Sequence, residues 1–128
     1  MLSVFSSPAR YTQGPNATRA LGQEIAGLGI KGPALIAAGR SALAQLSDTW
    51  KQTLGEVGCR YAVHGFGGEC SLAEILRIRR AAEALAAGVI IGVGGGKALD
   101  AARAAAAELS LPFVSCPTLA STDAPCSA

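Results

Sequence analysis

The run Val89–Val93 is followed at once by three glycines, a lysine and an alanine-rich stretch, and this succession constrains the fold more than any other feature. A short continuous apolar run is typical of a strand buried on both faces of a sheet. The glycines allow a tight turn, and the stretch at about 97–109 predicts a helix. A buried strand that turns directly into a helix is the repeating unit of a parallel sheet.

The same unit recurs along the chain. Three further runs predict strands, and the segments between them predict helices. These strands are Ala34–Ala38, Cys59–His64 and Pro112–Cys116, and the helices lie at about 41–54 and from the capping box Ser71–Glu74 onward. Nearer the start, Ser7–Gly14 predicts an edge strand or hairpin, and Asn16 is a candidate N-cap for a helix that reaches Leu28 and is stopped by Gly27 and Gly29. The alternation predicts an α/β fold, a Rossmann-like parallel sheet with helices on both faces.

Length, composition and charge limit the number of domains and the classes of binding partner. The 128 residues suffice for one domain, so residues 1–128 are expected to form a single α/β unit. The formal net charge of +2 arises from 11 basic and 9 acidic residues and gives no reason to expect a nucleic-acid surface. No membrane span is predicted, since the apolar runs are far shorter than the ~20 residues that a bilayer requires. Serines interrupt the apolar stretch near Met1, so no signal peptide is expected either.

The chain has four cysteines and one histidine, His64. No CxxC pair is present, so no structural zinc site is predicted. His64 falls in a predicted strand and is interpreted as a packed or partly exposed strand residue. The cysteines are expected to be free thiols in a reduced, cytoplasmic setting, with Cys70 and Cys126 as small packing residues.

Ligands of open α/β sheets bind beyond the carboxyl ends of the strands. Glycines or small polar residues follow every predicted strand here, so this edge of the sheet is expected to form a crevice. The segment Gly94–Lys97 is its most specific part. Glycine backbone N–H groups, the start of a helix and the charge of Lys97 together favour a phosphate, and Asp100 can accept hydrogen bonds from hydroxyls. A tight turn without a ligand is the alternative, because the spacing is neither GxGxxG nor that of a Walker A motif.

Four segments carry a resemblance to a known family: SPARYTQG at 7–14, FGGECS at 66–71, GGGKALD at 94–100 and PTLASTDAPCSA at 117–128. In this order they resemble the glycerol dehydrogenases, within the iron-containing alcohol dehydrogenase and dehydroquinate synthase superfamily. The resemblance implies that Gly94, Gly95, Gly96 and Lys97 cradle the pyrophosphate of a nicotinamide dinucleotide. Asp100, Thr118 and Ser127 are implied as further contacts with the dinucleotide.

The resemblance also implies a substrate and a second domain. Asp123 would bind a glycerol hydroxyl, although an aspartate before Ala124-Pro125 also suits an ordinary turn. In the family the catalytic zinc is held by a helical C-terminal domain, which these 128 residues do not include. The expected function is NAD(P)-dependent oxidation of glycerol or a related small polyol to the hydroxyketone, by a homo-oligomer. Zinc is expected only in the intact protein, and the chain alone is expected to be inactive, with no catalytic residue of its own.

Two other functions stay open. The chain could be a nucleotide-binding or interaction module without catalysis, or part of a superfamily member that acts on a phosphate-bearing substrate. The choice between NAD and NADP is also open. The family usually has an aspartate after the strand matching Ala34–Ala38, whereas this chain has Gly39-Arg40. An arginine there would attract the 2′-phosphate of NADP, unless it is simply a surface residue or stacks on the adenine.

Overall fold

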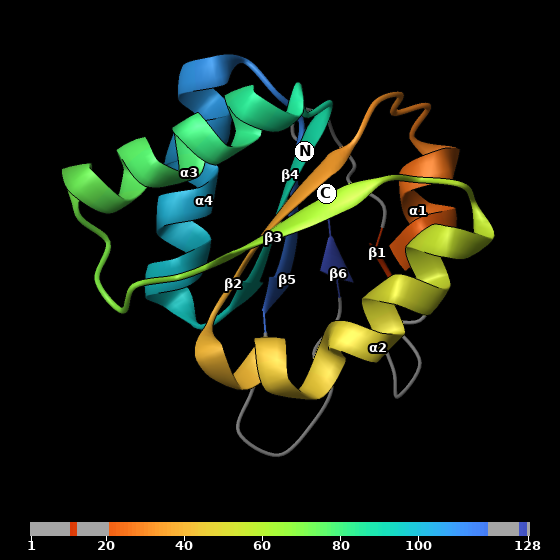
Figure 1. The fold of residues 1–128 in the computed structure, drawn as a ribbon, viewed down its shortest axis with the longest axis horizontal. Coiled ribbons are helices and arrows are strands. Elements are labelled where there is room, and N and C mark those ends of the chain that lie inside the picture. The colour runs from red at the N-terminus through yellow and green to blue at the C-terminus, as the bar shows by residue number, and fades with distance from the viewer. Residues whose placement is uncertain (1–10, 13–20, 118–125, 128) are drawn as a thin grey trace.

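In the computed structural model, which describes residues 11–12, 21–117 and 126–127, the strands form one six-stranded sheet in the order β1-β6-β5-β4-β2-β3 (Figure 1). Four strands are parallel: β2 (Ala34–Ala38), β3 (Tyr61–Gly65), β4 (Val89–Gly94) and β5 (Phe113–Pro117). The short strands β1 (Tyr11–Thr12) and β6 (Cys126–Ser127) add an antiparallel edge. The predicted parallel sheet is therefore confirmed, with a mixed edge beyond β5.

Helices cover both faces of the sheet, as predicted. Helices α1 (Leu21–Gly27) and α2 (Arg40–Glu56) lie on one side, and α3 (Leu72–Leu85) and α4 (Gly96–Leu109) lie on the other (Figure 1). Strand β2 is buried along its whole length, with Ile36 in the core on the α1–α2 side and Leu35 in the core on the α3–α4 side. A strand that serves both cores must be apolar at every position, which explains the continuous runs in β2 and β4.

Some predicted boundaries need correction. Strand β3 begins at Tyr61 instead of Cys59 and continues through Gly65, and β5 runs one residue past Cys116 to Pro117. In both strands backbone pairing with the neighbour sets the end, since Gly65 pairs with Ala38 and Pro117 with Gly94. Helix α1 ends at the predicted glycine, Gly27, whereas the proposed N-cap Asn16 lies outside the described residues.

The expectation of four free thiols, with Cys70 and Cys126 as packing residues, is only partly correct. Cys59 is a free, half-buried thiol and Cys70 is free but exposed. Cys70 lies between exposed residues of the loop after β3, so it has no core to pack into. Cys116 is buried in β5 and disulfide-bonded, so the prediction of a free thiol is wrong there. The side chain of Cys126 lies outside the described residues. Within the described ranges, no helix has the length and apolar character that crossing a bilayer requires.

Candidate functional site

Two helices start side by side at the carboxyl ends of adjacent strands. The last residue of β2, Ala38, pairs with Val93, one residue before the end of β4. Each strand turns directly into a helix whose N-cap is a glycine, Gly39 for α2 and Gly95 for α4. The Gly39 N–H donates a hydrogen bond to the Val93 carbonyl oxygen over 3.0 Å, which ties the two turns together. Neither helix has a side-chain cap. The first N–H groups of both helices therefore present partial positive charge at one place.

Three glycines shape the turn between β4 and α4. Gly94 is buried with φ at +141°, and an added Cβ would lie 3.4 Å from both the Gly39 nitrogen and the Ala98 Cβ. Only glycine suits that backbone without strain. Gly95 and Gly96 are exposed, and a Cβ at either would meet nothing within 4 Å. The backbone at the start of α4 is thus open to an incoming ligand.

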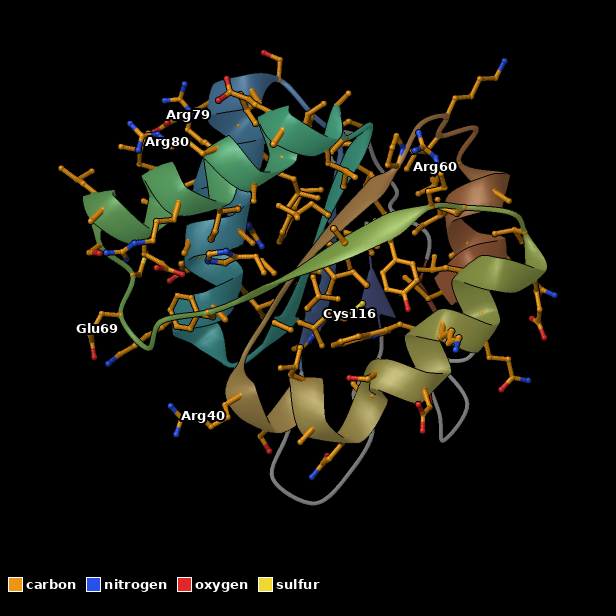
Figure 2. All side chains as sticks on the ribbon, viewed as in Figure 1. Arg40, Arg60, Glu69, Arg79, Arg80 and Cys116 are labelled. Atoms are coloured by element: carbon orange, nitrogen blue, oxygen red, sulfur yellow. The ribbon has the colours of Figure 1, made fainter. Side chains whose placement is uncertain are left out.

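Lys97 adds a full positive charge to this opening. Its ammonium lies 3.1 and 3.2 Å from the two carboxylate oxygens of Glu69, in the loop after β3 (Glu69 is labelled in Figure 2). Both side chains are exposed, so the pair is screened by solvent and contributes little stability. Sequence reasoning missed Glu69, although the rule that loops after parallel strands meet at one edge applies to it.

The other predicted residues are only partly described. Arg40 is the first residue of α2, and its side chain points away from the sheet into solvent (Figure 2). Asp100 is exposed one turn into α4. The structure thus brings Arg40, Asp100 and the segment Gly94–Lys97 to the same end of the sheet. Thr118 and Asp123 lie outside the described residues, and of Ser127 only the backbone, paired with Ser115, is described.

Half of the predicted capping box forms at the start of α3. The Ser71 hydroxyl accepts a hydrogen bond from the Glu74 N–H over 3.1 Å. The reciprocal bond, in which the Ser71 N–H would donate to the Glu74 carboxylate, does not form, and that N–H donates to the Glu69 carbonyl oxygen instead. The Glu74 carboxylate is buried and binds other donors.

Three donors surround the Glu74 carboxylate. His64 Nε2 and Arg77 Nη1 each lie 2.8 Å from one of its oxygens, and the Gly67 N–H donates over 3.1 Å. Burial alone would raise the pKa of Glu74, but the hydrogen bonds from His64, Arg77 and Gly67 outweigh it and hold that pKa below its ordinary value. The prediction that His64 is a packed or partly exposed strand residue is confirmed: it is partly exposed in β3, and its partner is the Glu74 carboxylate.

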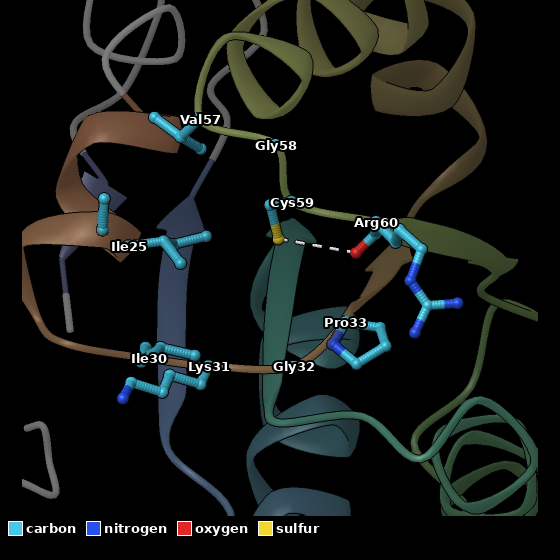
Figure 3. Close-up of a pocket in the computed structure, with 10 residues that line it drawn as sticks. Ile25, Ile30, Lys31, Gly32, Pro33, Val57, Gly58, Cys59 and Arg60 are labelled. Atoms are coloured by element: carbon cyan, nitrogen blue, oxygen red, sulfur yellow. Dashed lines mark hydrogen bonds between the residues drawn. The ribbon is translucent and has the colours of Figure 1, made fainter.

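A cavity of about 390 Å³ lies at the opposite, amino end of the strands (Figure 3). Its lining comes from the end of α1 and the segments before β2 and β3, and includes Lys31, Cys59 and Arg60. Burial raises the pKa of the Cys59 thiol, partly offset by a backbone hydrogen bond, so this cysteine is not activated as a nucleophile. Ligands of this sheet type bind at the other edge, so we assign the candidate site to the carboxyl ends.

Comparison with known proteins places this arrangement in a family. Residues 8–128 match the sequence model of the iron-containing alcohol dehydrogenase family. The chain belongs to the iron-containing alcohol dehydrogenase family. Glycerol dehydrogenase from Escherichia coli O6:H1 is 38% identical over 125 residues, covering 98% of this chain and 34% of that protein. Glycolaldehyde reductase from Halobacterium salinarum is 41% identical over 127 residues, covering 99% of this chain and 34% of that protein.

The fold is shared with solved members of the iron-containing alcohol dehydrogenases. The crystal structure of glycerol dehydrogenase from Schizosaccharomyces pombe superposes with a TM-score of 0.73 and 28% identity, covering 83% of this chain and 27% of that one. The chain spans about a third of the length of the curated relatives it matches.

The family resemblance implies two bound groups, a nicotinamide dinucleotide and a metal ion, and the described residues suit the dinucleotide. A dinucleotide phosphate fits the uncapped start of α4, where Gly95 and Gly96 leave the backbone open and Lys97 supplies charge. A metal ion needs several clustered ligands, and within residues 21–117 no three His, Cys, Asp or Glu side chains come together to form such a group.

Proposed function

We propose that this chain is the dinucleotide-binding part of an NAD(P)-dependent oxidoreductase that oxidises glycerol or a related small polyol to the hydroxyketone. The observation that carries the proposal is the pair of helix starts at the ends of β2 and β4. Each has a glycine at the N-cap position and no side-chain cap, and Lys97 lies beside the start of α4. The identity to glycerol dehydrogenases over nearly the whole chain supports the choice of substrate class.

The chain's own residues would bind and orient the cofactor. The N–H groups at the start of α4 and the Lys97 ammonium would hold the pyrophosphate, since both favour anions. Asp100, Thr118 and Ser127 would contact the rest of the dinucleotide, and Asp123 would hold a hydroxyl of the polyol. The bound nicotinamide would supply the hydride acceptor. A zinc ion of the intact protein, a homo-oligomeric state and a cytoplasmic location belong to the same proposal.

Substitution of Lys97 tests the proposed site. In Lys97→Met the dissociation constant for NADH should rise about three- to tenfold, because one charge-assisted contact to a phosphate is lost at a solvent-exposed position. Lys31→Met is the matched control, since Lys31 is also exposed but lines the cavity at the amino end of the strands. Equal affinity of the Lys97 variant and the control variant would place the phosphate elsewhere.

A further inference from the structure

The loop between β3 and α3, residues 66–71, forms one side of the carboxyl edge. Its residues 67–70 are exposed, yet Glu69 pairs with Lys97 at the start of α4. An exposed loop with two adjacent glycines has high conformational freedom unless something holds it. At its start, the Phe66 N–H donates to the Ala38 carbonyl oxygen over 2.8 Å. The middle of the loop needs another restraint.

Glu74 supplies that restraint from the first turn of α3. Its side chain is only 3% exposed, and a buried carboxylate is costly unless hydrogen bonds satisfy it. The three donors come from three different segments: His64 from β3, Gly67 from the loop and Arg77 from α3. One carboxylate thereby joins a strand, a loop and a helix at a single point.

The close approach of the loop to Glu74 depends on a glycine. A Cβ at Gly67 would lie 3.1 Å from Glu74 Oε1, so a side chain there would push the carboxylate away from its donors. His64 must donate, because an ionised carboxylate has no proton to give, and its Nε2 therefore carries a hydrogen in this contact. The arrangement is a fixed network of donors around one acceptor group.

We propose that Glu74, with His64 as its partner, is a positioning residue of the dinucleotide site: it fixes the β3–α3 loop and so keeps Glu69 beside the ammonium of Lys97. This inference rests on the proposed function. Without the network the loop and the lysine must become ordered when the cofactor binds. The apparent dissociation constant then rises in inverse proportion to the fraction of molecules that already have the binding arrangement.

The first test compares two substitutions at the same position by titration of the intact protein with NADH. Glu74→Met removes the acceptors at similar volume, and the dissociation constant should rise about three- to tenfold. Glu74→Gln keeps an oxygen for Gly67 and His64 and should stay within about twofold of wild type. Glu108→Met is the control, because Glu108 also bridges α3 and α4, through Arg79 at 2.9 Å, but lies at the far end of α4.

The second test asks whether Glu74 acts through Lys97. When two residues act independently, the fold-change in dissociation constant of the double variant is the product of the two single fold-changes. We expect Lys97→Met to cause a smaller fold-change in the Glu74→Met background than in wild type, because a released loop no longer places the ammonium. A purely structural role for Glu74 would leave the two fold-changes independent, and their simple product would overturn the inference.

A variant at His64 keeps the test informative even where Glu74→Met does not fold. His64→Ala should weaken NADH binding less than Glu74→Met, since Gly67 and Arg77 still hold the carboxylate, and His64→Gln should restore affinity by donating in place of the imidazole. Wild-type affinity in Glu74→Met and His64→Ala would refute the positioning role while leaving the proposed function intact. Failure of the wild-type protein to bind NADH or NADPH would refute the proposed function and this inference together.

Discussion

At the scale of single residues, Arg40 follows β2 where the family resemblance implies an aspartate. It begins α2 directly after β2, at the edge where the adenosine ribose is expected, and its side chain is exposed. A guanidinium matches the geometry of a phosphate and offers two parallel hydrogen bonds to it. If the ribose lies there, Arg40 would attract the 2′-phosphate of NADP, whereas an aspartate would favour the free hydroxyls of NAD.

Replacement of Arg40 by aspartate should shift cofactor preference from NADP toward NAD. The ratio of the two affinities is expected to change by about tenfold or more, because attraction of the 2′-phosphate becomes repulsion. Titration of wild type and Arg40→Asp with NADH and NADPH measures it. Arg60→Asp is a suitable control, since Arg60 lies at the opposite end of the sheet (Figure 2). An unchanged ratio would make Arg40 an ordinary surface residue.

The lowered pKa of Glu74 predicts how the stability of the fold depends on pH. Its pKa is lowered in the folded state, so its ionised form stabilises the fold at pH values above the unfolded pKa, and this contribution is lost as the pH falls through the folded pKa. Glu74→Gln should therefore lower the free energy of unfolding by about 1–3 kcal/mol near neutral pH. The difference from wild type should shrink steadily below about pH 4.5. Denaturant unfolding from about pH 7 to about pH 3 tests this, and a difference that does not vary with pH would contradict it.

At the scale of elements, the packing of α1 on α2 depends on one glycine. The Gly22 N–H donates to the buried Thr53 hydroxyl over 2.9 Å. A Cβ at Gly22 would lie 2.0 Å from the Thr53 carbonyl oxygen, so the two helix backbones are in direct contact there. This contact keeps Leu21 and Ile25 in the same core as Trp50 and Leu54 of α2.

Two glycines of this helix pair, Gly22 and Gly55, should respond to alanine in opposite ways. Gly22→Ala must push α1 away from α2 and should destabilise the protein by about 1–3 kcal/mol. Gly55 lies in α2 with nothing within 4 Å of an added Cβ, so Gly55→Ala should stabilise the helix by about 0.5–1 kcal/mol. Chemical denaturation of both variants provides the comparison. Equal changes in the free energy of unfolding would mean that α1 moves away from α2 without loss of stability.

At the scale of the whole molecule, local sequence patterns were sufficient to predict the framework. The continuous apolar runs gave the parallel strands, and the glycines after Val93 marked the turn into α4, because both features act within a few neighbouring residues. The Lys97–Glu69 pair and the Glu74 network were not predicted, since they join residues from different elements. The capping-box motif predicted that the Glu74 carboxylate caps α3. The motif alone does not show that this carboxylate is buried and accepts hydrogen bonds from His64, Arg77 and the Gly67 N–H instead.

The 128 residues alone should bind NADH or NADPH but should not oxidise glycerol, even with zinc added. Hydride transfer from an alcohol requires a polarised hydroxyl, which a metal ion achieves as a Lewis acid. Within residues 21–117 no three His, Cys, Asp or Glu side chains come together as metal ligands, and this chain spans about a third of its relatives. NADH formation by the purified, mass-verified chain should be absent under conditions in which a full-length glycerol dehydrogenase is active. Measurable turnover of glycerol by the chain alone would show that the catalytic groups lie within these residues.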